Sequence, residues 1–152
     1  MTTGPRFASR KPRFNHVAMS LLPDELDEEH RKLRGDFYGD VFGFHDLPMM
    51  TIDRKRQVFQ VHHIEQFVFL IADDPPMTCP RLDHFGLSVA EESELDDILA
   101  RAETWQARDD RVDIIDKKTE DHGMLAITSI YVRYLLPMML EIQWWDYKQP
   151  NA

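Results

Sequence analysis

The sequence has a single cysteine, no long apolar run and too few basic residues to balance its acids. Cys79 has no second cysteine to pair with, which excludes an intramolecular disulfide and makes a reducing cytoplasm the simplest setting. No apolar stretch approaches the roughly 18 residues of a membrane span, and residues 1–13 lack the apolar core of a signal peptide. We therefore expect a cytoplasmic protein with no membrane contact.

The charge and length of the chain indicate one soluble domain. Its 27 acidic and 18 basic residues give a net charge of −9, which argues against binding to nucleic acid. Its 152 residues, 43% of them hydrophobic, suffice for one hydrophobic core. We predict a single domain over residues 14–146, with a loose basic tail before it at 1–13 and a short tail after it at 147–152.

Two stretches of the chain share an unusual alternating pattern. Between residues 82 and 89, apolar side chains alternate with His84, Gly86 and Ser88, which is the period-two pattern of a strand with one face on a core. On the other face the small neighbours leave the imidazole as the only group that reaches outward. Residues 14–21 repeat this pattern around His16, 68 positions before His84. The repetition suggests a duplicated fold with a site shared between its two copies.

The rest of each half follows the same order of strand, helix and three strands. In the first half, Pro23-Asp24 is typical of a helix start and Gly39 and Gly43 of its end. A linker rich in Asp and Pro separates the halves at residues 73–81. The predicted strands cover 44–54, 57–63 and 66–71 in the first half, and 112–117, 125–133 and 138–145 in the second, after a helix over 91–107. We predict an α+β fold of two tandem βαβββ modules, residues 14–74 and 82–146, that form a cupped mixed sheet around a metal site.

A carboxylate in the last predicted strand supports that metal site. Glu141 lies within the apolar run of residues 138–145, where burial is costly unless the charge is paired or bound to a cation. If the two modules pack as pseudo-symmetric copies, His16, His84 and Glu141 converge on one point. Two imidazoles and one carboxylate form a facial triad that leaves metal positions open for other ligands. For either histidine taken alone, an ordinary hydrogen-bonded strand residue is the alternative.

Several of these features together resemble the vicinal oxygen chelate superfamily. They are the paired βαβββ layout, the two histidine strands, the segment Phe-Tyr-Gly-Asp-Val-Phe-Gly-Phe at 37–44 and Leu140-Glu141-Ile142. That superfamily includes glyoxalases, epimerases, fosfomycin- and bleomycin-resistance proteins and extradiol ring-cleaving dioxygenases. The resemblance implies a cupped sheet around a divalent metal, a small-molecule substrate and a homodimer.

Within the superfamily, the last third of the chain is most similar to extradiol dioxygenases. His122, Ile130-Tyr131, Pro137 and Glu141 fall at spacings that the signature of these enzymes permits. Tyr134-Leu135 replaces the usual Asp-Pro pair, and Glu120 stands where a small or apolar residue is usual. A further similarity is His62-His63, ahead of the strand at 66–71, where these dioxygenases carry an acid–base histidine.

This closer resemblance implies a ring-cleaving dioxygenase of a catecholic substrate. It implies Fe(II), or alternatively Mn(II) or Zn(II), bound by His16, His84 and Glu141. It also implies His62 or His63 as the acid and base, and His122 and Tyr131 as hydrogen-bonding partners of the substrate. The alternative for His122 is a turn residue without a catalytic role. For His62-His63 the alternative is a partly exposed strand end.

Two other functions remain open from the sequence. One is another metal-dependent enzyme, namely a lyase, an isomerase or a fosfomycin-type transferase, and the other is a non-catalytic bleomycin-type binding protein. Glyoxalases generally draw a fourth metal ligand from the strand that mirrors Glu141, but the strand at 66–71 offers none and Asp73 lies in a turn. Three ligands favour a dioxygenase-like or a thiol-transferase-like site. Trp144 and Trp145 line either a pocket or a dimer seam.

Overall fold

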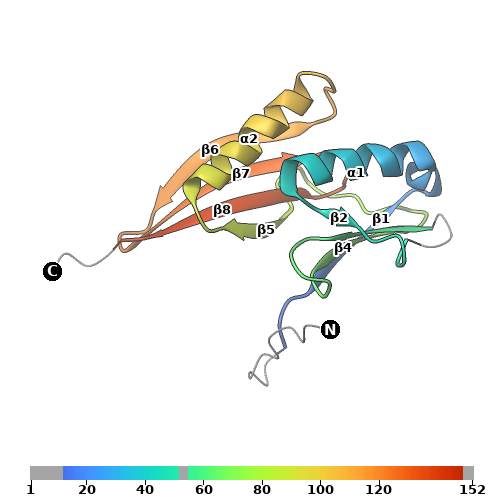
Figure 1. Ribbon diagram of the computed structural model, residues 1–152, viewed down its shortest axis with the longest axis horizontal. Coiled ribbons are helices and arrows are strands. Elements are labelled where there is room, and N and C mark those ends of the chain that lie inside the picture. The colour runs from blue at the N-terminus through green and yellow to red at the C-terminus, as the bar shows by residue number, and fades with distance from the viewer. Residues whose placement is uncertain (1–11, 52–54, 149–152) are drawn as a thin grey trace.

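The computed structural model describes residues 12–51 and 55–148, and the predicted α+β class with two βαβββ modules is confirmed (Figure 1). The first module consists of β1 (His16–Leu21), a 3-10 turn η1 (Pro23–Leu26), α1 (Glu28–Phe42), β2 (His45–Asp46), β3 (Arg56–Gln60) and β4 (Phe67–Ala72). The second consists of β5 (His84–Val89), α2 (Glu92–Gln106), β6 (Asp113–Asp121), β7 (Leu125–Arg133) and β8 (Met139–Tyr147).

Each module forms its own four-stranded mixed sheet, and the two sheets have equivalent strand orders. The orders are β1-β4-β3-β2 and β5-β8-β7-β6. In both sheets the histidine-bearing strand lies at an edge and pairs in parallel with the last strand of its module, while the other pairings are antiparallel. Ala18 lies opposite Phe69 in the first sheet, just as Gly86 lies opposite Glu141 in the second. The duplication seen in the sequence is therefore a duplication of strand register.

The helices begin and end close to the predicted positions, with one difference at the start of α1. Pro23 and Asp24 form the separate turn η1, and α1 is capped instead by Asp27, whose carboxylate accepts the His30 N–H at 2.8 Å. Gly43, at φ 68°, ends α1 in the left-handed conformation that glycine adopts without strain.

The strand predicted over residues 44–54 is the largest departure from the sequence analysis. Only His45–Asp46 pair with β3, and residues 52–54 lie outside the described part of the chain. Pro48 has no N–H to donate to a sheet, and the Met50 N–H turns back to the Leu47 carbonyl at 2.9 Å. The chain therefore leaves the sheet after two residues.

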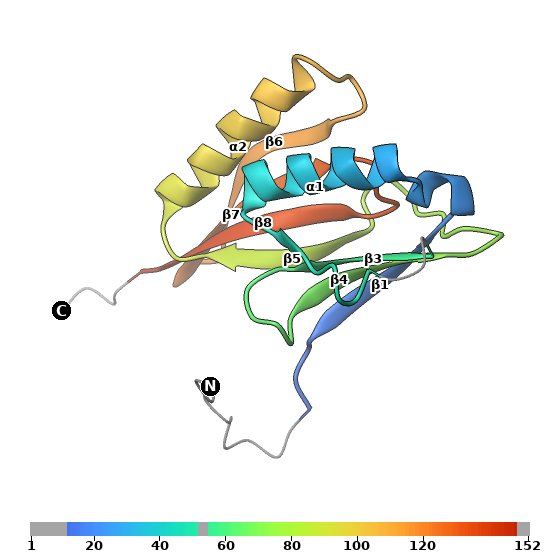
Figure 2. The same cartoon turned by 45° about the vertical axis from the view of Figure 1, so that its right-hand side comes forward.

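Both helices lie on the same side of the molecule, above the two sheets (Figures 1 and 2). The core packs between helices and sheets, and its side chains include Leu26, Phe37, Tyr38, Leu95, Ile130 and Leu140. Tyr38 on α1 connects the modules, because its hydroxyl donates to the Tyr134 carbonyl at 2.8 Å and accepts the Tyr134 N–H at 3.0 Å. Trp105 on α2 donates to the Asp40 carboxylate on α1 at 2.8 Å. No helix among the described residues is long and apolar enough to cross a membrane.

We predict that Tyr38→Phe destabilises the protein by about 1–3 kcal/mol, because it leaves the buried Tyr134 N–H and carbonyl without their partner. Thermal and urea unfolding measure the change. Tyr147→Phe is the matched control, since Tyr147 is 71% exposed, and it should leave the midpoint unchanged. Equal midpoints for both variants would show that the hydrogen-bonded link between the modules contributes nothing.

Candidate functional site

The second sheet has one face covered by α2 and one face free of any helix. Alternation places Ile130, Val132, Leu140 and Ile142 against α2, and all four are buried. The opposite face, which we call the open face, carries the polar side chains of the strands. Paired residues form three successive rows across it: Ile115, Tyr131, Glu141 and Gly86; then Ser129, Gln143 and Ser88; then Ile127 and Trp145.

Glu141 is the centre of this face, and two side chains converge on its carboxylate. The Tyr131 hydroxyl donates to Oε1 at 2.7 Å, and His84 Nε2 lies 3.2 Å from Oε2. The His84 and Tyr131 rings meet edge to face with centroids 5.1 Å apart. Gly86 lies opposite Glu141, and a Cβ there would make an ordinary van der Waals contact with Oε2 at 3.7 Å. The open face thus places a carboxylate, an imidazole and a phenol within mutual contact.

The hydrogen bond on the other side of His84 fixes which ring nitrogen faces the carboxylate. His84 Nδ1 lies 2.7 Å from the Leu82 carbonyl, which can only accept, so Nδ1 carries a proton. In a neutral imidazole, Nε2 then carries a lone pair. That lone pair faces a carboxylate oxygen, which also has only lone pairs. Such a contact is favourable only with a cation, either a proton or a metal ion, between the two atoms.

These donors fit a divalent metal ion. Imidazole nitrogen and carboxylate oxygen are ligands of Mn(II), Fe(II) and Zn(II), and a metal-binding histidine typically donates its other N–H to a backbone carbonyl, as His84 does. Glu141 is 8% exposed, and no lysine or arginine pairs with its charge in the described part of the chain. The cluster therefore offers two protein ligands to a metal.

Tyr131 is held in its protonated form. Burial is the main cause that raises its pKa, to about 12, and the hydrogen bond and negative charge of Glu141 add to it. At neutral pH the phenol is a donor to Glu141 and not a base. Its position fixes the carboxylate oxygen Oε1 and leaves Oε2 on the side of His84.

His16 occupies the same place in the first sheet that His84 has in the second, but the described residues contain no group of three metal-ligating side chains. Its Nδ1 lies 2.7 Å from the Asn15 side-chain oxygen, and its ring stacks on Phe67 with centroids 4.8 Å apart. Because that amide oxygen accepts, a neutral His16 ring would carry its proton on Nδ1 and a lone pair on Nε2, as a neutral His84 ring would. One chain brings two of the three predicted ligands together and leaves His16 apart from them.

The other predicted site residues lie away from Glu141. His62 and His63 lie in the connection between β3 and β4, with ring centroids 4.1 Å apart. His62 shares a cleft of about 470 Å³ between the modules with His16 and with Gly86 and Ser88. His122 follows β6 in the turn before β7, and its Nε2 lies 4.0 Å from Glu120.

The register of β6 and β7 shows how far His122 is from the cluster. The residue before it, Asp121, pairs with Ala126, and Tyr131 lies five residues further along β7. At about 3.4 Å per residue, this separates His122 from Tyr131 by about 17 Å. His122 therefore lies far along the sheet from the row of Tyr131 and Glu141.

The strand that mirrors Glu141 supplies no further ligand. Phe69 occupies the equivalent register position in β4, opposite Ala18. Asp73 lies beyond β4, and its N–H donates to the Leu21 carbonyl at 2.9 Å. The structure also shows polar residues of the open face that the sequence analysis passed over, above all Arg133 and its partner Asp113. Arg133 stands two positions after Tyr131, so strand alternation was a sufficient signal for it.

Comparisons with known proteins identify the fold. No family model matches the sequence, and no curated protein sequence does. A lactoylglutathione lyase structure from Agrobacterium tumefaciens matches with a TM-score of 0.60 and 16% identity over 90% of this chain and 96% of that one. The fosfomycin resistance protein FosX of Listeria monocytogenes, as a point mutant with Mn(II) and 1S,2S-dihydroxypropylphosphonic acid, matches with a TM-score of 0.58 and 13% identity over 86% and 89%. An integron cassette protein from the metagenome of the Halifax Harbour sewage outfall matches with 0.56 and 17% over 84% and 94%.

The chain therefore shares its fold with these proteins. The FosX structure was determined with Mn(II) bound. None of the three supports the dioxygenase in particular.

We predict that Glu141→Gln lowers the pKa of Tyr131 from about 12, because the variant removes the negative charge that opposes the tyrosinate. Burial remains, so the pKa stays above the ordinary value of about 10. A pH titration of ¹³C-labelled tyrosine by NMR follows the phenol directly. Glu103→Gln, on the outer side of α2, should change nothing, and an unaltered Tyr131 pKa in Glu141→Gln would contradict the contact.

Proposed function

We propose that this protein is a metal-dependent enzyme whose substrate is a small molecule with two neighbouring oxygens. The observation that carries the proposal is the convergence of His84 Nε2 and the Tyr131 hydroxyl on the Glu141 carboxylate in a sheet face that no helix covers. A divalent ion bound by His84 and Glu141 would accept the two oxygens and lower the pKa of a hydroxyl among them. Tyr131 holds Glu141 in place and keeps a proton close to the substrate.

The third ligand in this proposal is His16 of a second copy of the chain. His16 and His84 begin the edge strands of equivalent sheets, and each has its Nδ1 bonded to an oxygen and its Nε2 available. Since one chain does not bring His16 to Glu141, a homodimer in which the first sheet of one copy faces the second sheet of the other would complete a triad. Two equivalent sites per dimer follow.

Among the reactions of this fold, we favour addition or elimination on the substrate, as in a lyase, an isomerase or a fosfomycin-type enzyme. The structural neighbours are a lactoylglutathione lyase and FosX. His122, which the ring-cleaving signature would place at the substrate, lies about 17 Å along the sheet from Tyr131 in the row of Glu141. A ring-cleaving dioxygenase using Fe(II) is the second candidate, favoured by the three-ligand set and by Tyr131 on the strand beside Glu141.

We predict a metal site that needs residues of two chains. Purified wild type should bind one Mn(II) per chain, and Glu141→Ala and His16→Ala should each lose this binding almost completely, although the two residues are separate within one chain. Equilibrium dialysis with metal analysis measures the stoichiometry. When the two variants are mixed, unfolded and refolded together, each mixed dimer should recover one of its two sites. At that site the Glu141→Ala chain supplies His16 and the His16→Ala chain supplies Glu141.

His45→Ala is the matched control, since His45 lies exposed on β2, and it should bind metal like the wild type. If the wild type binds no divalent metal, a metal-dependent enzyme is excluded and a non-catalytic binding protein is the remaining candidate. Normal metal content in His16→Ala, or no recovery in the mixture, would rule out the shared site.

Oxygen consumption separates the two candidate reactions. We predict that Fe(II)-loaded protein, reconstituted without oxygen and then mixed with oxygen and a panel of catechols, consumes no oxygen and forms no yellow ring-fission product. The physical reason is the distance of about 17 Å along the sheet that separates His122 from Tyr131 in the row of Glu141. Rapid, metal-dependent oxygen uptake that Glu141→Ala abolishes would instead establish the dioxygenase.

A further inference from the structure

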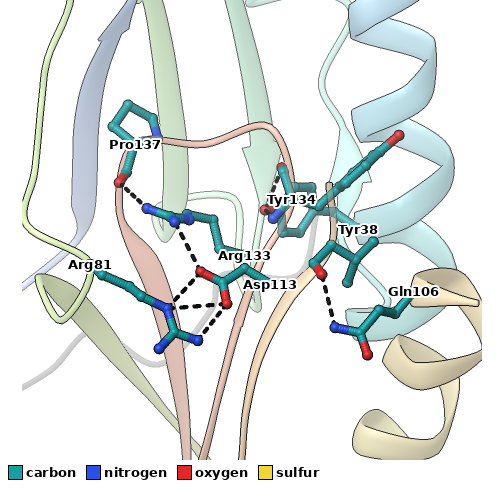
Figure 3. A network of polar contacts seen from close by, with 8 residues as sticks. Tyr38, Arg81, Gln106, Asp113, Arg133, Tyr134 and Pro137 are labelled. Atoms are coloured by element: carbon teal, nitrogen blue, oxygen red, sulfur yellow. Dashed lines mark hydrogen bonds and ion pairs between the residues drawn. The ribbon is translucent and has the colours of Figure 1, made fainter. Parts of the chain in front are cut away.

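The open face ends, beyond the row of Glu141, in two arginines that share one carboxylate. Asp113, the first residue of β6, lies opposite Arg133 at the end of β7, and Arg133 Nη2 donates to it at 2.9 Å. Arg81, three residues before β5, donates to the same carboxylate through Nε at 3.1 Å and Nη2 at 2.7 Å. Figure 3 shows the two guanidinium groups on either side of Asp113.

The sheet order explains where these charges lie. Since β8 and β7 separate β5 from β6, Arg81 must extend across the ends of two strands to reach Asp113. Arg133 stands two residues from Tyr131, on the same face, about 7 Å along β7. Met139, which lies opposite His84, is fully buried at this end of the face. The two guanidinium groups therefore lie at the end of the open face that is nearest to the cluster of His84, Glu141 and Tyr131.

The charge of this network is positive in a protein whose net charge is −9. Two guanidinium groups surround one carboxylate, and Arg81 is the main cause that holds the Asp113 pKa below its ordinary value. Within the described residues, Arg81 Nη1 and Arg133 Nε make no hydrogen bond, so donors remain for a further anion. The Arg81 side chain is 55% exposed, and an ion pair at such a site contributes little stability.

The other end of the open face carries two large apolar side chains. Ile127 and Trp145 pair across β7 and β8 two rows beyond Glu141, and Trp145 is 39% exposed. The remaining charges on this face, Lys118 and Glu120, form an ion pair with each other at 3.0 Å. A ligand on the open face therefore meets Arg81 and Arg133 at one end, and at the other Ile127 and Trp145 beside the internally paired Lys118 and Glu120.

From this arrangement we infer that Arg81 and Arg133 form a binding site for an anionic group of the substrate, a carboxylate or a phosphonate. The inference builds on the proposed function, because it orients the substrate: the two metal-binding oxygens lie at Glu141 and the anionic group lies toward Asp113. Arg133 is a specificity residue with a planar set of donors suited to two anion oxygens. Asp113 competes with the substrate for the same guanidinium groups and sets the strength of the site.

Two catechols serve as probes, because both present neighbouring oxygens and they differ in charge. One is 3,4-dihydroxybenzoate, which carries a carboxylate, and the other is 4-methylcatechol, which is neutral. Calorimetric titration of Mn(II)-loaded protein without oxygen gives both affinities. Arg133→Gln and Arg81→Gln should each weaken 3,4-dihydroxybenzoate binding about tenfold and leave 4-methylcatechol binding within about twofold, since only the first probe loses a charge-assisted hydrogen bond.

Asp113→Asn is the decisive variant, because it should strengthen 3,4-dihydroxybenzoate binding by releasing both guanidinium groups. A purely structural network predicts the reverse, since the loss of Asp113 would loosen the end of the sheet. Arg108→Gln is the matched control and should alter neither affinity, because Arg108 lies two residues after the end of α2 and donates to the Thr104 carbonyl of that helix.

If the arginine variants change the affinities for both probes equally, or change neither affinity, the anion site is overturned and the proposed function stays intact. Failure of the Mn(II)-loaded wild type to bind either probe would overturn the proposed function and this inference together.

Discussion

The interaction on which the site depends is the pairing of a carboxylate with a phenol and an imidazole in the middle of a sheet. Glu141 stands between Leu140 and Ile142, which are both buried against α2, so strand alternation holds its side chain on the opposite face. There it has no lysine or arginine partner among the described residues. Its carboxylate accepts a hydrogen bond from the Tyr131 hydroxyl through one oxygen, and the other oxygen lies 3.2 Å from His84 Nε2.

The duplicated modules place His16 on a different sheet from His84 and Glu141. Each sheet uses one face for its helix and leaves the other open, with a histidine at the start of the edge strand. The connection between the modules runs through α1, by way of the bonds of Tyr38 to Tyr134 and of Asp40 to Trp105. These contacts join the helix sides of the modules.

The fold is shared with enzymes of different chemistry, and the site residues therefore decide what the protein can do. Identity with the structural neighbours is 12–17%, so their reactions do not transfer to this chain. The side chains along the open face change from two arginines at one end, through Glu141, to Ile127 and Trp145 at the other.

The sequence by itself determined the two modules, the histidine-bearing strands and the position of Glu141, because period-two alternation and repetition are local properties of the chain. It did not determine that β2 ends before Pro48, that Asp27 caps α1, or that His122 lies far from Tyr131. Only the tertiary structure brought Arg81 across the sheet to Asp113 and Arg133, and only it separated His16 from Glu141. Those facts depend on strand order and register, which are set by contacts between residues far apart in the chain.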